Sequence, residues 1–259
     1  MVNEALLEDR VRRKDFFDKF KRRLLKKCIV RNDFLLDVGS GSGKFLYHSK
    51  NLFKKCAGIE VQNECVYFAR NQLGLKIEKD ILAVNDTISV ATFWHSLEHM
   101  PIENIGQILR HINCRASFDT RIVISVPNND SLQYKIFKED SAYYDPANHI
   151  HQFSVKSLDR LMEEYGFVKQ RSFYSFIYSC FGYLQGFLNE CCPIHNYLYY
   201  GKKRGETFGK TRGNLLFYDV YNFLLAVLFI IPALLFSIFD FIYQEKGGLI
   251  TACYIKKKN

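Results

Sequence analysis

Three glycines at alternate positions follow a short apolar segment of the chain. Residues 34–38 read Phe-Leu-Leu-Asp-Val, and Gly39, Gly41 and Gly43 come directly after them. An apolar run before such a turn is typical of a buried parallel strand that leads into a helix. Glycine allows positive φ angles and lets a ligand approach the main chain closely. The pattern therefore predicts a nucleotide-type cofactor site.

Asp37 indicates which cofactor this turn suits. It stands at the carboxyl end of the predicted strand, where ligands bind in open α/β sheets. The dinucleotide fingerprint G-x-G-x-x-G needs glycine where this chain has Lys44, and no G-x-x-x-x-G-K-[ST] is present. A pyrophosphate would be repelled by Asp37, whereas a ligand with an ammonium group would be attracted to it.

The elements that must position this turn alternate along the chain. Strands are expected at residues 34–38, 56–60, 75–79, 88–94, 120–126, 167–175 and 248–255. Helices are expected at residues 4–27, 43–53, 63–72, 102–116 and 154–165. This alternation predicts an α/β fold with a doubly wound, Rossmann-like sheet.

Further motifs follow the glycine turn in order. Residues 56–60 end a second strand in the acid Glu60, and residues 79–81 read Lys-Asp-Ile. Residues 97–101 read Leu-Glu-His-Met-Pro, residues 122–128 form an apolar run that exits through Pro-Asn, and residues 149–154 read His-Ile-His-Gln-Phe-Ser. Together with residues 37–43, this set resembles the class I S-adenosylmethionine-dependent methyltransferases. The Leu-Glu-His-x-Pro segment resembles the quinone-ring O-methyltransferase-like subgroup, of methyltransferase type 11 or 23.

The resemblance implies a seven-stranded sheet whose last strand is antiparallel, with S-adenosylmethionine as the cofactor. Asp37 and the glycine turn would hold the methionine part, and Glu60 would accept hydrogen bonds from the ribose hydroxyls. Asp80 and Ile81 would bracket the adenine, which Gln62 would cover. The expected cofactor-binding residues are Asp37, Gly39, Ser40, Gly41, Gly43, Glu60, Gln62, Asp80, Ile81 and Trp94.

Deprotonation of the acceptor requires a base near neutral pH, and imidazole suits this task. The candidates are His95, His149 and His151, with His99 as a further one that in this subgroup is often structural. Glu98 could orient an imidazole, and whether a divalent metal takes part is left open. The segment after residue 94 has no Asn/Asp-Pro-Pro-Tyr/Phe motif, which favours an oxygen acceptor over a nitrogen one.

A hydrophobic helical insertion is expected before the final strand. Residues 220–239 carry no charge, and this uncharged run is long enough for a membrane span. Pro232 lies near its middle and favours two short helices instead. Such a hairpin, over residues 214–243, would enter one leaflet. Packing against the domain, a homodimer interface and a true span are the alternatives. The predicted divisions are residues 1–30 (an amphipathic helix), 31–175 with 247–259 (the methyltransferase domain) and 176–246 (the insertion).

Charge and cysteine content narrow the class of protein. The chain has 259 residues, a net charge of +9 and eight cysteines without a C-x-x-C pair. Basic residues cluster near both ends and at residues 202–212, which suits an anionic membrane surface. No secretory signal opens the chain, so we expect a cytoplasmic protein with free thiols, peripheral or monotopic on the inner membrane face.

These observations predict an enzyme that O-methylates a small-molecule, lipid-linked or glycan acceptor. A non-catalytic membrane-associated scaffold is the first alternative, and the intact cofactor motifs argue against it. A nucleic-acid methyltransferase is the second. No nucleic-acid partner is expected, because the basic residues do not alternate with an aromatic platform on which bases would stack.

Overall fold

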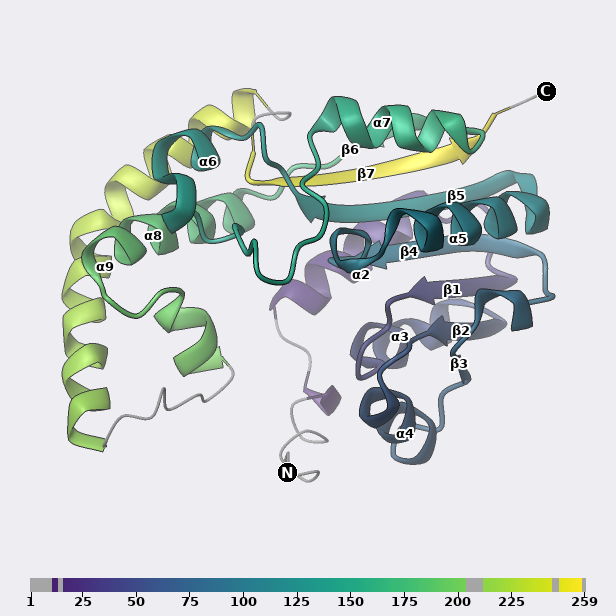
Figure 1. Cartoon of the computed structure of the whole chain (residues 1–259), viewed down its shortest axis with the longest axis horizontal. Helices are drawn as coiled ribbons and strands as arrows, with labels where there is room; N and C mark the ends of the chain where they lie inside the picture. The colour runs from purple at the N-terminus through teal and green to yellow at the C-terminus, as the bar shows by residue number, and fades with distance from the viewer. Residues whose placement is uncertain (1–10, 14–15, 204–211, 244–246, 258–259) are drawn as a thin grey trace. The chain divides into compact units, whose positions relative to one another are not determined.

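The computed structural model describes residues 11–13, 16–203, 212–243 and 247–257, and divides the chain into two compact units (Figure 1). We call them the sheet unit and the helical unit. The sheet unit comprises Met1–Val126, Lys156–Phe173 and Thr251–Asn259, and the helical unit comprises Pro127–Val155 and Tyr174–Ile250. The helical unit thus groups residues 127–155 with the expected insertion, and the predicted division into three parts stays a prediction.

A seven-stranded sheet in the order β3-β2-β1-β4-β5-β7-β6 confirms the predicted fold class. β1 pairs in parallel with β2 and β4, whereas β6 pairs antiparallel with β7, whose arrow in Figure 1 runs against that of β5. The strands are β1 (Phe34–Val38), β2 (Lys55–Ile59), β3 (Ile77–Glu78), β4 (Ile88–Trp94), β5 (Ala116–Pro127), β6 (Phe167–Ser172) and β7 (Leu249–Lys256). Every residue of β1 and β4 is buried, as expected for central parallel strands.

The helices that follow the strands lie within a few residues of their predicted positions. They are α2 (Phe16–Cys28), α3 (Lys44–Ser49), α4 (Asn63–Asn71), α5 (Ile102–Arg115) and α7 (Val155–Glu164), with 3₁₀ turns η1 (Lys50–Leu52), η2 (Ile81–Ala83) and η3 (Leu97–His99). α2 is the described part of the predicted amphipathic helix, and its Leu24 and Leu25 are buried in the core. Residues 1–10 and 14–15 of that prediction lie outside the described residues.

The helical unit packs around its two longest helices. Its elements are α6 (Leu132–Phe137), η4 (Lys138–Asp140), α8 (Phe176–Cys191), η5 (Leu198–Lys203) and α9 (Arg212–Ile242). The ring of Phe187 stacks on Phe229 at 4.8 Å between centroids, and the ring of Tyr183 stacks on Phe236 at 5.1 Å. These aromatic pairs join α8 to α9 along much of their length.

The predicted break at Pro232 is wrong, because α9 is one helix that runs through this proline. Proline removes one backbone donor from a helix interior and normally kinks or breaks it. Here the turns on both sides are held on α8, by Phe229 before the proline and Phe236 after it. Packing of a helix face outweighs a local propensity penalty in most protein helices.

The two acidic residues of α9 face into the helical unit. Asp240 accepts hydrogen bonds from Ser179 Oγ at 2.7 Å and from Tyr183 OH at 3.0 Å. Asp219 accepts one from Tyr197 OH at 2.6 Å. The two acids of α9 are therefore both bound by protein hydroxyls, although they bracket a run that hydropathy alone describes as uniformly apolar.

A buried amide network ties the end of α8 to the loop after α6. The side chain of Asn189 donates to the Asp140 carbonyl at 2.9 Å and accepts from the backbone N–H of Asn196 at 2.8 Å. Asn196 in turn donates to the Ala142 carbonyl at 3.3 Å. Since neutral amides bound at both ends fix a loop firmly, this network should determine the path of residues 140–142.

We expect Asn189→Ala to destabilise the folded protein by about 1–3 kcal/mol, because buried amide and carbonyl groups lose their partners. Glu190→Ala is the matched control, since Glu190 is the exposed neighbour on the same turn of α8. Denaturant unfolding monitored by circular dichroism measures both. Equal stability of the two variants would show that the network contributes nothing.

Candidate functional site

The glycine turn after β1 adopts the backbone that the sequence predicts. Gly39, Gly41 and Gly43 have φ angles of 72°, 52° and 77°. A Cβ on Gly39 would lie 2.4 Å from Ser96 Cβ, so only glycine fits there. A Cβ on Gly41 would meet nothing within 4 Å, so the main chain at this point faces open space. A ligand can therefore approach this part of the backbone closely.

Glu60 closes the other side of the turn. One carboxylate oxygen accepts from Gly41 N at 2.7 Å, and the other accepts from Val61 N at 2.8 Å and Gln62 N at 2.9 Å. The carboxylate thus binds the glycine turn to the start of α4. The Glu60 side chain lies next to the open side of the Gly41 main chain, which is where an acid that binds ribose hydroxyls would have to lie. Its bond to Gly41 also holds that main chain in place.

Asp37 is fully enclosed at the end of β1. It accepts a hydrogen bond of 2.6 Å from Thr92 Oγ1 on the neighbouring strand β4. Burial raises the pKa of Asp37 to about 7, while the Thr92 hydroxyl and the charge of Lys21 act against that rise. Near neutral pH, Asp37 is therefore poised to ionise when a cation is placed beside it.

The residues expected around the adenine lie on the short segments after β2 and β3. Asp80 caps η2 by accepting from Leu82 N at 2.9 Å, and Ile81 is buried. Gln62 is exposed and immediately precedes α4. Only the Oδ1 atom of Asp80 makes this capping bond, so its other carboxylate oxygen can accept a hydrogen bond from a ligand.

Trp94 brings an unexpected neighbour to the site. Its ring lies edge-on to Phe45 at 5.2 Å between centroids, and the Lys21 ammonium of α2 lies 5.3 Å from its ring centroid. Sequence reasoning treated Lys21 only as one member of a basic cluster. No local pattern could place it here, because the contact depends on how α2 packs on the domain.

Two buried polar atoms at the site fit a bound ligand. In the part of the chain that the structure describes, Ser40 Oγ and Trp94 Nε1 are buried and make no hydrogen bond. Such groups are costly unless a partner arrives. With the open backbone of Gly41 and the carboxylate of Glu60, they fit S-adenosylmethionine, which carries an amino group, hydroxyls and an adenine ring.

His95 directly follows β4 and is held in a strained conformation. Its φ angle is 55°, in the left-handed region that non-glycine residues seldom adopt. The backbone N–H of His95 donates to the Ser125 carbonyl at 2.9 Å. The ring Nδ1 of His95 lies 3.5 Å from a carboxylate oxygen of Glu98. Ser96, next in sequence, donates to the Val38 carbonyl at 2.8 Å. These contacts fix His95 to the strand that leads into the glycine turn and place Glu98 to orient its imidazole.

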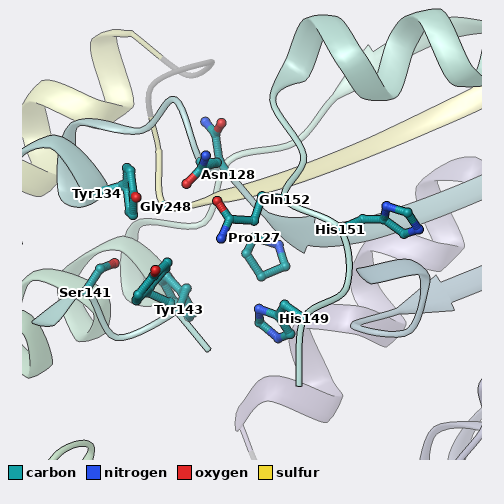
Figure 2. A pocket seen from close by; sticks show the side chains of 11 residues that line it. Pro127, Asn128, Tyr134, Ser141, Tyr143, His149, His151, Gln152 and Gly248 are labelled. Atoms are coloured by element: carbon teal, nitrogen blue, oxygen red, sulfur yellow. The ribbon is translucent and has the colours of Figure 1, made fainter. Parts of the chain in front are cut away.

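His149 and His151 belong to the helical unit, whereas His95 belongs to the sheet unit. Both line a small pocket there, of about 350 Å³ with its open mouth included. Its other walls include Asn128, Tyr134, Tyr143 and Gln152. Figure 2 shows the imidazole of His149 on the tyrosine side of the loop and that of His151 across it. Sequence reasoning predicted the histidines but missed the tyrosines and amides.

We expect Glu60→Ala to weaken S-adenosylmethionine binding by about tenfold to a hundredfold, because hydrogen bonds to a charged group are lost and the Gly41 backbone is released. Glu64→Ala is the control, since Glu64 is an exposed acid on α4. Calorimetric titration with the cofactor and with its demethylated product measures the effect. Unchanged affinity in Glu60→Ala would remove Glu60 from the site.

The pKa of Asp37 predicts a pH dependence of cofactor affinity. Because burial raises that pKa to about 7, Asp37 is mostly neutral below this pH and pairs with an ammonium group only as it ionises. Affinity for S-adenosylmethionine should therefore rise between about pH 6 and pH 8 and then level off. The Asp37→Asn variant should bind more weakly without this rise. A wild-type affinity that is flat over this range would contradict the assignment.

Comparison with solved structures supports the fold. A S-adenosylmethionine-dependent methyltransferase from Archaeoglobus fulgidus aligns over 99% of this chain and 100% of its own, with 18% identity and a TM-score of 0.53. A TehB-like S-adenosylmethionine-dependent methyltransferase from Corynebacterium glutamicum aligns over 94% of this chain and 90% of its own, with 11% identity and a TM-score of 0.51. Identities this low establish similarity of fold alone. No curated protein matches the chain.

A protein family described as a methyltransferase domain matches residues 9–171. This match covers more than half of the chain, including the glycine turn, Glu60, Asp80 and His95. The chain therefore belongs to the methyltransferase domain family, and its cofactor is S-adenosylmethionine.

Proposed function

We propose that the protein transfers a methyl group from S-adenosylmethionine to an oxygen atom of a small-molecule, lipid-linked or glycan acceptor at the cytoplasmic face of a membrane. The observation that carries this proposal is the composition of the helical unit. It combines a pocket of tyrosines, amides and histidines with a long helix whose outer face is apolar. An amphipathic acceptor has a polar part that suits such a pocket and an apolar part that suits such a helix face.

The bound cofactor supplies an activated methyl group, which leaves positioning and proton removal to the chain. As the acceptor oxygen takes the methyl group, its hydroxyl proton must pass to a base. His95 suits this role, because it lies at the carboxyl edge of the sheet beside Glu98. Its left-handed φ is the kind of local strain that concentrates at functional sites.

The pocket has the chemistry of a site for hydroxyl-bearing rings. The rings of Tyr134 and Tyr144 lie 5.5 Å apart between centroids and offer apolar faces. Gln152 offers an amide donor and acceptor, and His149 offers a second imidazole. Few polar groups set among aromatic faces are typical of small-molecule sites. Phenols and sugars both match this set.

The pocket wall is continuous with the long helices of the same unit. Tyr143 OH donates to the Tyr178 carbonyl at 2.8 Å, near the start of α8. Asn189, near the end of α8, holds the Asp140 carbonyl. A membrane that contacts α8 and α9 would therefore lie against the same unit that contains the proposed acceptor pocket. This arrangement supports delivery of the acceptor from a membrane.

The proposed location rests on two further observations. Among the described residues, one helix segment, Gly213–Ile242, has the length and composition of a membrane span, with a mean hydropathy of 2.6 and 17% of its best window buried. All eight cysteines are free, which suits a reducing compartment such as the cytoplasm. A homodimer that covers the same apolar face is the alternative to membrane contact.

Methyl transfer can be tested without knowing the acceptor. The purified protein is incubated with S-adenosylmethionine carrying a tritiated methyl group and with three fractions: membranes, a lipid extract and a soluble extract. We expect label in a membrane or lipid acceptor, resistant to mild alkali as an ether would be. His95→Ala should reduce labelling by about a hundredfold or more, as loss of a general base does.

His195→Ala is the matched control, because His195 is exposed and lies outside both sites. It should label the acceptor at the rate of the unchanged protein. Label found only in protein or nucleic acid would overturn the proposal, and so would equal activity of His95→Ala and the unchanged protein.

A further inference from the structure

The outer face of α9 is apolar along its whole length. Leu216, Phe217, Phe223, Leu224, Leu228 and Ile231 are each more than 60% exposed. Between residues 213 and 243 the only charged residues are Asp219 and Asp240, and both are bound by hydroxyls of the helical unit. A helix on a water-facing surface shows the opposite pattern, with polar residues outward. The face therefore needs an apolar environment over many turns.

The inner face of α9 is covered by protein over nearly the same length. Asp240 contacts Ser179 near the start of α8, and the Tyr221 hydroxyl donates to the Cys191 carbonyl at its end. α8 therefore runs antiparallel beside α9 from residue 240 back to residue 221. Among the described residues of the helical unit, the opposite side of α9 is left to meet another phase.

This cover argues against a helix that crosses a bilayer. α6 also packs on α8, where Gln133 donates to the Ser179 carbonyl at 3.1 Å. α6 and the following turn carry Lys135, Lys138 and Glu139, all exposed. If α9 spanned the membrane, these charges would be carried toward the hydrocarbon, where charged side chains are strongly disfavoured. An orientation with the helix axis along the surface leaves them in water.

Charge favours lipid over a second copy of the chain. The sequence of residues 202–212, which leads into α9, contains Lys202, Lys203, Arg204, Lys210 and Arg212 with a single acid, Glu206. Such a segment is attracted to anionic headgroups and would be repelled by the same segment of a two-fold-related partner. Among the exposed residues described for α9, Asn214 carries the one polar side chain, so this face offers little for the hydrogen bonds of a protein interface.

We propose that α9 docks on the anionic surface of one leaflet, with its axis in the membrane plane, its outer face in the acyl region and its inner face on α8. This inference deepens the proposed function, on whose membrane location it rests. It names the partner as an anionic lipid surface and excludes a span.

Vesicle flotation tests the docking. The full chain should float with phosphatidylcholine vesicles that contain phosphatidylserine, and less well without it. A double change, Leu224→Glu with Leu228→Glu, should lower the bound fraction at least about tenfold. Phe118→Glu is the control, because Phe118 is 67% exposed in the sheet unit, and it should float normally. Circular dichroism and cofactor titration should be unchanged in both variants.

Depth measurements distinguish a docked helix from a span. Tryptophan is placed singly at Phe217, Leu228 and Phe239, which lie on the outer face near the start, middle and end of α9. Quenching by lipids brominated at different acyl positions is measured, and the signal of Trp94 in the parent protein is subtracted. In-plane docking predicts the same shallow depth at the three positions. A deep middle position with shallow ends would show a span and overturn the proposal.

Two other results would also overturn it. One is a lipid-free dimer that Leu224→Glu with Leu228→Glu converts to monomer while the unchanged protein ignores vesicles. The other is equal flotation of that variant and the unchanged protein. Failure here leaves methyl transfer to soluble acceptors intact, whereas loss of methyl transfer with normal flotation would overturn the proposed function alone.

Discussion

The carboxylate of Glu60 is the interaction on which the shape of the glycine turn depends. It accepts a hydrogen bond from the backbone N–H of Gly41 on one side and from those of Val61 and Gln62 on the other. One side chain therefore joins the glycine turn to the start of α4. The turn is also bound from behind, since Gly39 N donates to the Ile59 carbonyl at 2.8 Å. A backbone with positive φ angles at three alternate residues is costly by itself, and these bonds define its shape before any ligand arrives.

Sequence patterns were sufficient for the sheet unit, and the reason is local. Each strand is a short apolar run, and the turn after β1 needs glycine at positions that only glycine can occupy. The site contacts that escaped prediction are long-range. Lys21 meets Trp94 because α2 packs on the domain, and the tyrosines of the pocket gather because α8 holds their loop. No spacing in the chain encodes either contact.

Prediction failed in the helical unit for a different reason. Proline was read as a break, but the aromatic stacks on α8 hold the helix on both sides of it. The sequence shows only that residues 220–239 carry no charge. The acids at either end of this run, Asp219 and Asp240, lie on the protein side, bound to hydroxyls. Along α9 the acids are satisfied inside the unit, while many apolar side chains are left outside, so a rule that assigns every apolar residue to the interior does not apply to this helix.

The order of strands has a consequence for synthesis of the protein. β7 lies between β5 and β6 in the sheet, yet it follows α9 in the chain. While the chain is being made, β5 and β6 cannot be joined until α9 has already left the ribosome. Large domains commonly form in stages as the chain emerges. The apolar helix is therefore exposed before the sheet that carries the cofactor is closed, and the surface that first receives α9 can influence whether the enzyme is completed.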